Sequence, residues 1–283
     1  MKQKTLKRSF SVEGTGLHTG VPVRMEVRPA PENTGYIFVR SDLDDFEIPA
    51  SVEYISHCSY ATTLLKNGVV LSTCEHLLSA LRGLGVDNCF IYLDNIEIPI
   101  LDGSSENFVD LIRQVGLVDQ NAPRRFLRVL KKVEYSHGDR KMSIEPADSF
   151  QIECAIDFDH PMIGTQTLNI TVTEEGYGKE IASARTFGFT HEIEQLRKAN
   201  LALGGSLDNA IVLDEQGMLN ETPLRFQNEF VRHKILDLIG DLALLGMPLQ
   251  GKVTAAKSGH AVHASMMATL LKTPDAWEIV ESA

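Results

Sequence analysis

The chain has 283 residues, of which 43% are hydrophobic and 23% are charged, as is ordinary for a globular protein of one large domain or two smaller ones. Its formal net charge of -11 argues against a nucleic-acid partner, because phosphate backbones are bound by clustered Lys and Arg. The four cysteines form no CxxC pair, and no apolar run suits a secretory signal or a transmembrane segment, so we expect a cytoplasmic protein without disulfides.

The first half opens with strand-like alternation. Apolar residues occupy every second position from Val21 to Val27, as in a half-buried strand. Lys66-Asn-Gly68 lies between two apolar runs and predicts a hairpin turn. A helix capped by Ser72 or Thr73 should follow and end at Gly85. We also expect strands over Tyr36–Val39, Asn88–Leu93 and Ile96–Leu101, and a helix from Ser104 or Ser105 to Gly116.

The second half follows a polar segment, Gln120–Arg125, that contains Pro and is the predicted linker. Strand-like runs cover roughly Phe126 to Phe158. A long helix is predicted to start at Thr222–Pro223, because Pro suits the first turn, and to run to Gly246. The last elements are a strand over Gly251–Lys257 and a helix over about His260–Leu271.

The two halves therefore share one order of elements: strands, helix, strands, helix. This order suggests two domains of similar build, residues 1–122 and 123–283. The second half has an extra segment at about 187–213, which we predict to be strand, helix, strand.

The long helix carries three ionisable residues on one stripe. His233, Asp237 and Asp241 recur at intervals of four, in a segment that is otherwise apolar over most of its circumference. Buried ionisable side chains are costly unless they are paired or bound to a metal. Two interpretations stay open: His233 and Asp237 form a pair within the core, or they are two ligands of one metal ion.

Glu75 and His76 lie in the first turn of the helix predicted in the first half. His76 taken alone could be an ordinary surface residue, or it could be a metal ligand beside a carboxylate base. Catalytic zinc commonly takes three protein ligands and leaves one position for water. Two ligands from one helix and one from the other half would form such a site between the domains, a common place for pockets.

His260 follows Lys257-Ser-Gly at a strand-to-helix turn, where functional residues often lie. It could be a general acid, since imidazole titrates near neutral pH, or simply the first residue of a helix. Among the other histidines, we expect His263 to face outward and His160 to be structural. Three more, His57, His137 and His191, fall in polar stretches and should be solvated.

Several strings, in order along nearly the whole chain, resemble the UDP-3-O-acyl-N-acetylglucosamine deacetylase family, bacterial zinc amidases that commit their substrate to lipid A synthesis. The strings are Thr15-Gly-Leu-His-Thr-Gly20, Cys74-Glu-His-Leu-Leu-Ser-Ala-Leu81, Ile98-Pro-Ile-Leu-Asp-Gly-Ser104, Asp157-Phe-Asp-His-Pro161, Ala184-Arg-Thr-Phe-Gly-Phe189, Asn200-Leu-Ala-Leu-Gly-Gly-Ser206, Val231-Arg-His-Lys-Ile-Leu-Asp-Leu-Ile-Gly-Asp241 and Lys257-Ser-Gly-His260.

The resemblance implies an α+β fold of two similar domains, each a sheet layered against helices, with the active site between them. It implies one catalytic Zn²⁺ and the hydrolysis of the substrate's N-acetyl group with release of acetate. The implied zinc ligands are His76, His233 and Asp237. The other implied roles are those of base (Glu75), general acid (His260), carboxylate that orients the acid (Asp241), donor to the oxyanion (Thr186) and substrate-binding side chains (Lys234, Phe158, His18).

The family's second-domain insert forms a passage for the substrate's acyl chain. Here that insert corresponds to the extra segment, with Phe187, Ile193, Leu196, Ala202 and Ala210 as its expected lining. Tyr60 stands at the passage mouth, where some relatives carry an aliphatic or Met side chain. The implied partner is an acylated UDP-sugar, and we expect a monomer. Some relatives also have a longer C-terminal tail that is read by a regulatory protease.

Three other functions would fit parts of the pattern. The chain could be a different metal-dependent amidase on the same scaffold. It could be a non-catalytic protein that binds an acylated sugar nucleotide, although Glu75 and His260 are both dispensable for holding a metal and so argue against this. It could also be a structural protein in which His233 and Asp237 are only a core network.

Overall fold

A five-stranded sheet forms the base of the first half. Its strand order is β2 (Phe10–Thr15), β3 (Pro22–Pro29), β9 (Cys89–Leu93), β4 (Tyr36–Arg40) and β5 (Phe46–Pro49). Val23, Met25 and Val27 of β3 are buried, as their alternation predicts, whereas Val21 precedes the strand and is exposed. A smaller sheet joins β6 (Ile55–His57), β7 (Thr63–Lys66) and β8 (Val69–Leu71). Asn67 and Gly68 form the predicted hairpin turn with positive φ at both positions, 49° and 85°.

A seven-stranded sheet forms the outer layer of the second half. β18 (Leu249–Ala256) is central and pairs with β11 (Arg125–Val129), β13 (Arg140–Glu145) and β14 (Phe150–Phe158). The remaining strands are β12 (Val133–His137), β15 (Gly164–Thr171) and β19 (Trp277–Glu281). Alternate residues of β18 are buried, which places one face of this sheet against the helices.

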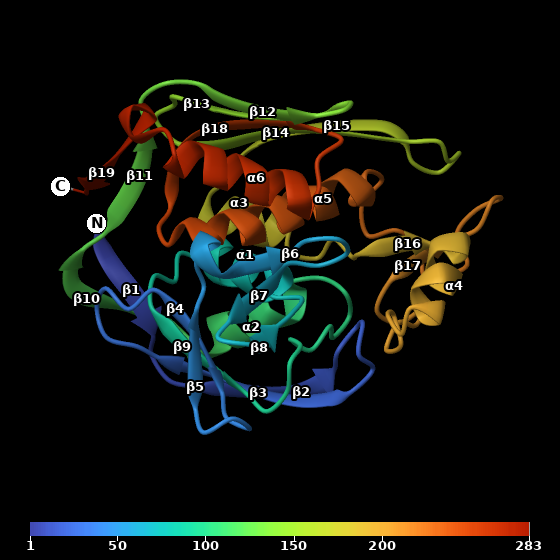
Figure 1. Cartoon of the computed structure of the whole chain (residues 1–283), viewed down its shortest axis with the longest axis horizontal. Coiled ribbons are helices and arrows are strands. Elements are labelled where there is room, and N and C mark those ends of the chain that lie inside the picture. The colour runs from blue at the N-terminus through green and yellow to red at the C-terminus, as the bar shows by residue number, and fades with distance from the viewer. Residues whose placement is uncertain (283) are drawn as a thin grey trace.

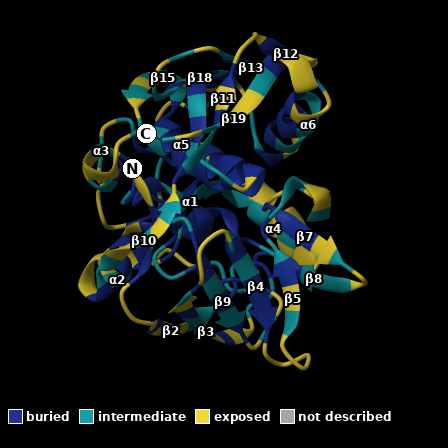
Figure 2. Cartoon of the chain, turned by 90° about the vertical axis from the view of Figure 1, so that its left-hand side faces the viewer, coloured by how far each residue is buried: buried dark blue, intermediate teal, exposed yellow. Residues whose placement is uncertain are grey.

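The computed structural model, which describes residues 1–282, stacks these sheets on either side of a double layer of helices (Figure 1). α5 (Glu229–Leu242) and α6 (His260–Leu271) lie under the second sheet, and α1 (Glu75–Gly83) and α2 (Glu106–Val115) lie over the first. α3 (Glu174–Glu180) packs beside α1. α1 and α5, from opposite halves, contact each other at the buried centre of the molecule (Figure 2). The expected α+β architecture is confirmed.

The extra segment of the second half projects from one side of these layers. It consists of β16 (Phe187–Phe189), α4 (Thr190–Lys198) and β17 (Ile211–Leu213), and the two strands are parallel (Figure 1). This is the predicted order of strand, helix and strand. No residue of α4 is buried, and its Ile193 and Leu196 line a pocket instead of packing into the main core.

Two expectations for irregular and extended segments are wrong. The predicted linker is largely strand: β10 (Leu117–Pro123) pairs antiparallel with β1 (Lys2–Leu6), so its polar residues lie in a two-stranded ribbon. Conversely, Ile96–Leu101 forms no strand and makes only isolated bridges, Ser72 to Glu97 and Gly16 to Pro99. Pro99 has no N–H with which to extend a ladder.

Two predicted helix starts also differ. α5 begins at Glu229 and not at Thr222–Pro223, because the Glu229 carboxylate accepts hydrogen bonds from the backbone N–H of Arg225 and of Arg185 and so turns the preceding chain. α1 begins at Glu75 without a cap from Ser72 or Thr73. Their hydroxyls bond elsewhere, Ser72 with Thr63 and Thr73 with Glu97.

Candidate active site

α1 and α5 bring three predicted metal ligands together. The ligand atoms of His76, His233 and Asp237 lie within 4.8 Å of one another, and all three residues are buried. Asp237 Oδ1 is 3.3 Å from His233 Nε2 and 3.6 Å from His76 Nε2. Two residues come from one helix and one from the other half of the chain, as the sequence predicts.

The chemistry of this group fits a cation. His233 Nδ1 lies 3.0 Å from the carbonyl oxygen of Ala184, which leaves the Nε2 lone pair facing Asp237. Burial lowers the pKa of His233 to about 3, so the imidazole is in the neutral form that binds metals. Within residues 1–282, Asp237 Oδ1 and His76 Nδ1 are buried without a hydrogen-bond partner. An unpaired buried carboxylate oxygen is costly unless a cation compensates it.

Glu75 lies beside this group, at the N-terminal turn of α1. Burial raises the pKa of its carboxyl, and the nearby His260 partly offsets this. Glu75 Oε2 accepts a hydrogen bond of 3.1 Å from the backbone N–H of Thr62, and Oε1 is 3.8 Å from His260 Nε2. A carboxylate held in this way, with its pKa raised, suits a general base.

His260 is the first residue of α6, and its ring spans from Asp241 to the metal group. Its Nδ1 lies 2.7 Å from Asp241 Oδ2, while its Nε2 lies 3.9 Å from Asp237 Oδ2. Burial disfavours a charge on His260, but the Asp241 carboxylate outweighs this and raises the pKa of His260 to about 10. Asp241 itself has its pKa lowered, because its imidazole partners outweigh the effect of burial. At neutral pH the imidazole is therefore protonated, and its Nε2 carries a proton on the side of the metal group.

A cavity of about 220 Å³ lies over these residues. Its wall includes Glu75, His76, His233, Asp237 and His260, together with Thr186 and Lys234. The backbone of Thr186 is fixed by hydrogen bonds to Gly103 and Ile211. Lys234 Nζ donates to Asp237 Oδ2 over 3.0 Å. Three of the four predicted catalytic residues, Glu75, Thr186 and His260, therefore line one cavity. The fourth, Asp241, lies behind His260 and is hydrogen-bonded to it.

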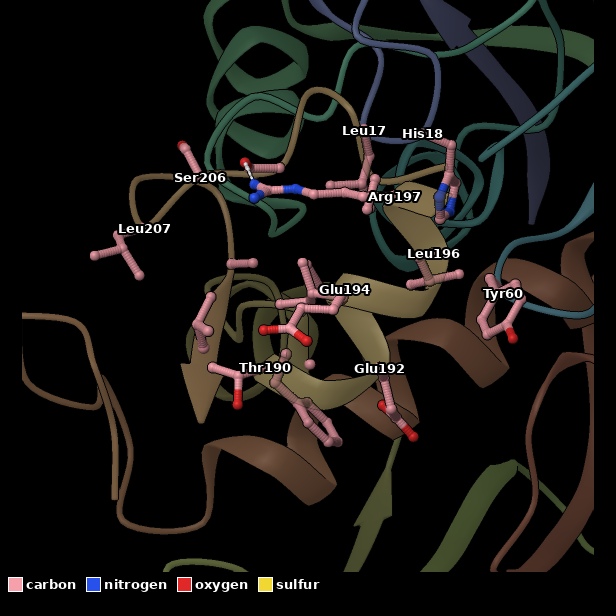
Figure 3. Close-up of a pocket in the computed structure, with 18 of the residues that line it drawn as sticks. Leu17, His18, Tyr60, Thr190, Glu192, Glu194, Leu196, Arg197, Ser206 and Leu207 are labelled. Atoms are coloured by element: carbon pink, nitrogen blue, oxygen red, sulfur yellow. Dashed lines mark hydrogen bonds between the residues drawn. The ribbon is translucent and has the colours of Figure 1, made fainter. Parts of the chain in front are cut away.

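A second cavity, of about 400 Å³, adjoins the first and is walled largely by the extra segment; its lining side chains are drawn in Figure 3. The two share Leu17, Tyr60, Thr186 and Phe187 in their walls. All five residues expected to line an acyl passage lie in this wall, and so does His18. Phe158 lines neither cavity; its ring packs edge-on against Phe187, with centroids 5.5 Å apart.

The prediction for His263 is wrong. His263, expected to face outward, is buried, and its Nδ1 lies 2.7 Å from Asp241 Oδ2. The spacing of His260 and His263 by three residues places them on one helix face, which is a signal that could have identified it. His160 is buried with its Nε2 2.7 Å from the carbonyl oxygen of Asp214, which fits a structural role. As expected, the other three, His57, His137 and His191, are exposed.

Three further residues of the site carry no recognisable signal in the sequence. Thr62 donates from Oγ1 to Asp241 over 2.6 Å, in addition to its backbone bond to Glu75. Glu97 is a buried carboxylate that fixes the loop of His18: it accepts from the backbone N–H of His18 and from the hydroxyl of Thr73, just before α1. Arg140 adds a cation to the wall of the smaller cavity.

Comparisons with known proteins agree with this geometry. The sequence model of UDP-3-O-acyl N-acetylglycosamine deacetylase matches residues 3–272. The chain is 50% identical over 283 residues to the UDP-3-O-acyl-N-acetylglucosamine deacetylase of Coxiella burnetii (strain Dugway 5J108-111), covering 99% of this chain and 93% of that protein. It is 47% identical over 283 residues to the enzyme of the same name from Hahella chejuensis (strain KCTC 2396), covering 99% and 94%. The chain therefore belongs to the UDP-3-O-acyl N-acetylglycosamine deacetylase family.

Proposed function

We propose that this protein hydrolyses the N-acetyl group of a UDP-3-O-acyl-N-acetylglucosamine, releasing acetate and a free amine in the committed step of lipid A synthesis. The observation that carries the proposal is the convergence of Glu75, His260 and the group of His76, His233 and Asp237 on one cavity. A protein that only bound the substrate, or a structural protein, would have no use for a buried base and a buried acid facing the same space.

We propose zinc as the ion held by His76, His233 and Asp237. Two neutral imidazole nitrogens and one carboxylate oxygen are a typical catalytic zinc set. When bound, zinc lowers the pKa of a water molecule to about 7 and polarises a carbonyl oxygen.

The chain's own residues would then divide the proton transfers. The oxygen of the attacking water forms a bond to the acetyl carbon, and Glu75 takes a proton from that water. The Thr186 hydroxyl donates a hydrogen bond to the carbonyl oxygen as negative charge develops there. The carbon–nitrogen bond breaks, and His260 gives the Nε2 proton to the departing nitrogen. Asp241 holds His260 protonated until this step.

The wider cavity supports the choice of substrate. The passage beyond Tyr60 is lined by apolar side chains such as Phe187, Ile193 and Leu196, which suit an acyl chain. Lys234 and Arg140 supply cations at the smaller cavity, as a diphosphate requires. We propose that the protein functions as a monomer. We also propose residues 1–122 and 123–283 as the two domains. Within residues 1–282, the structure has no helix long and apolar enough to cross a membrane.

The proposal is tested by measuring acetate release from the acylated UDP-sugar, with and without a chelator, and then with zinc added back. We expect activity that the chelator abolishes and zinc restores. The unacylated UDP-N-acetylglucosamine serves as the control and should be a poor substrate. Equal activity on simple acetylated sugars would indicate a different amidase. Chelation without any change in activity or stability would contradict the proposal and favour a structural role.

A further inference from the structure

A second histidine shares the carboxylate that orients the general acid. His260 Nδ1 and His263 Nδ1 each lie 2.7 Å from the same atom, Asp241 Oδ2. The two rings are nearly perpendicular, at 81°, with centroids 6.1 Å apart. His263 is buried and does not line the cavity. It therefore acts on the general acid and not on the substrate, and its hydrogen bond reaches His260 through Asp241.

The hydrogen bonds fix the proton positions in this cluster. An ionised carboxylate only accepts hydrogen bonds, so each Nδ1 must carry a proton and donate it. The other nitrogen of His263, Nε2, lies 3.0 Å from the hydroxyl oxygen of Ser258 and can accept its proton. Asp241, His260 and His263 also lie close enough to be considered as metal ligands. Because the Nδ1–H groups of His260 and His263 both donate to Asp241 Oδ2, the cluster is a hydrogen-bond network and not a metal site.

We propose that His263 is a positioning residue for the general acid. Asp241 Oδ1 accepts from the Thr62 hydroxyl at 2.6 Å, and Oδ2 accepts from His263 Nδ1 at 2.7 Å as well as from His260. Ser258 fixes the His263 ring in turn. With both oxygens held, the carboxylate has one orientation, and the His260 ring bound to it keeps Nε2 directed at the cavity, 3.8 Å from Glu75 Oε1. Without His263, the only donor to Asp241 Oδ2 would be His260, the side chain that Asp241 orients.

The test compares substitutions that remove or keep the hydrogen bond. This inference rests on the proposed deacetylase activity, so the wild-type zinc enzyme must first release acetate; failure there would count against the proposed function, not against His263. His263→Leu removes the donor, and we expect kcat to fall about tenfold while KM and the zinc content stay within twofold. His263→Asn places an amide N–H near the position of Nδ1 and should restore most of kcat. Met266→Leu, a buried α6 substitution of similar volume, should leave kcat unchanged.

A structural role predicts a different result. If His263 only stabilised α6, then His263→Leu would lower the melting temperature and leave kcat per folded enzyme unchanged, which would overturn the inference. If His263→Leu does not fold, Ser258→Ala decides, because Ser258 is only half-buried and its loss frees the His263 ring. We then expect kcat to fall severalfold at constant KM. If His263→Leu does not fold, wild-type kcat in Ser258→Ala would overturn the inference.

Discussion

At the scale of single residues, the site is a set of buried charges that compensate one another. Asp237 faces His76, His233 and Lys234, and Asp241 faces Thr62, His260 and His263. Asp241 has hydrogen-bond donors on both oxygens, so its charge is satisfied within the protein. Asp237 accepts from Lys234 at Oδ2 but has no donor at Oδ1 within residues 1–282, which leaves Oδ1 available to bind a cation. This difference fits Asp237 as a metal ligand and Asp241 as the carboxylate that orients His260.

Substitutions of Asp237 and His260 should therefore fail in different ways. Asp237→Ala removes a ligand, and we expect zinc affinity to fall by about 100-fold or more. His260→Ala leaves the ligand set intact, so it should retain about one zinc per chain while kcat falls about 10²- to 10⁴-fold. Elemental analysis after dialysis, combined with steady-state kinetics, distinguishes the two. Near-normal turnover in His260→Ala would rule out its assignment as the acid.

At the scale of elements, the position of the base depends on how closely two helices approach. A Cβ atom at Gly240 of α5 would overlap the carbonyl oxygen of Glu75 and lie 2.7 Å from its carbonyl carbon. Glycine at this position is what lets the first turn of α1 rest on α5. Farther along α1, the Ser79 hydroxyl donates to the carbonyl oxygen of Leu236 over 2.8 Å and fixes the register of the two helices.

Gly240→Ala isolates this contact. In an ordinary helix this change stabilises by about 0.5–1 kcal/mol, because alanine loses less conformational freedom on folding. Here the methyl group must displace the backbone of Glu75, and a shift of about 1 Å at a reacting group can cost about 100-fold in rate. We expect a lower kcat and a lower free energy of unfolding, measured by kinetics and urea denaturation. A variant that is both more stable and fully active would show that the approach is not required.

At the scale of the whole molecule, ion pairs hold the two halves in the arrangement that completes the site. Arg225, which precedes α5, lies 2.8 Å from Asp102 and 3.4 Å from Glu106 of the first half. The next residue, Gly103, accepts the backbone N–H of Thr186 over 2.8 Å. The Asp102 segment is therefore attached both to the start of α5 and to the predicted oxyanion donor.

The pH dependence of stability should reveal this connection. Burial raises the pKa of Asp102, but hydrogen bonds from Arg225 and Ser104 outweigh it, and the net pKa is lowered. A lowered pKa means that the stabilisation is complete above the unfolded-state value of about 3.9 and is lost as the pH falls through the folded-state value. Asp102→Asn should therefore cost about 1 kcal/mol of unfolding free energy at pH 7 and progressively less below about pH 4. Denaturation curves at several pH values measure this, and a pH-independent difference would contradict it.

The sequence alone determined the elements whose signal is local. The alternation in β3, the Asn67-Gly68 turn, α6, and the order of strand, helix and strand in the extra segment all follow from neighbouring residues. The stripe of His233, Asp237 and Asp241 was equally local, because helical spacing puts residues four apart on one face. The other roles in the site came from resemblance to a family, and spacing alone left each of them open.

Only the tertiary structure decided what depends on distant partners. The polar segment 117–123 is a strand because β1 lies beside it, and α5 starts late because Glu229 is occupied by the backbone of Arg185 and Arg225. α3 and β15 were not predicted at all. Thr62 and Glu97 join the site through hydrogen bonds across the fold, and His263 turns inward because Asp241 offers it an acceptor. Periodicity shows which face of an element is apolar, but it does not show which buried polar group will find a partner there.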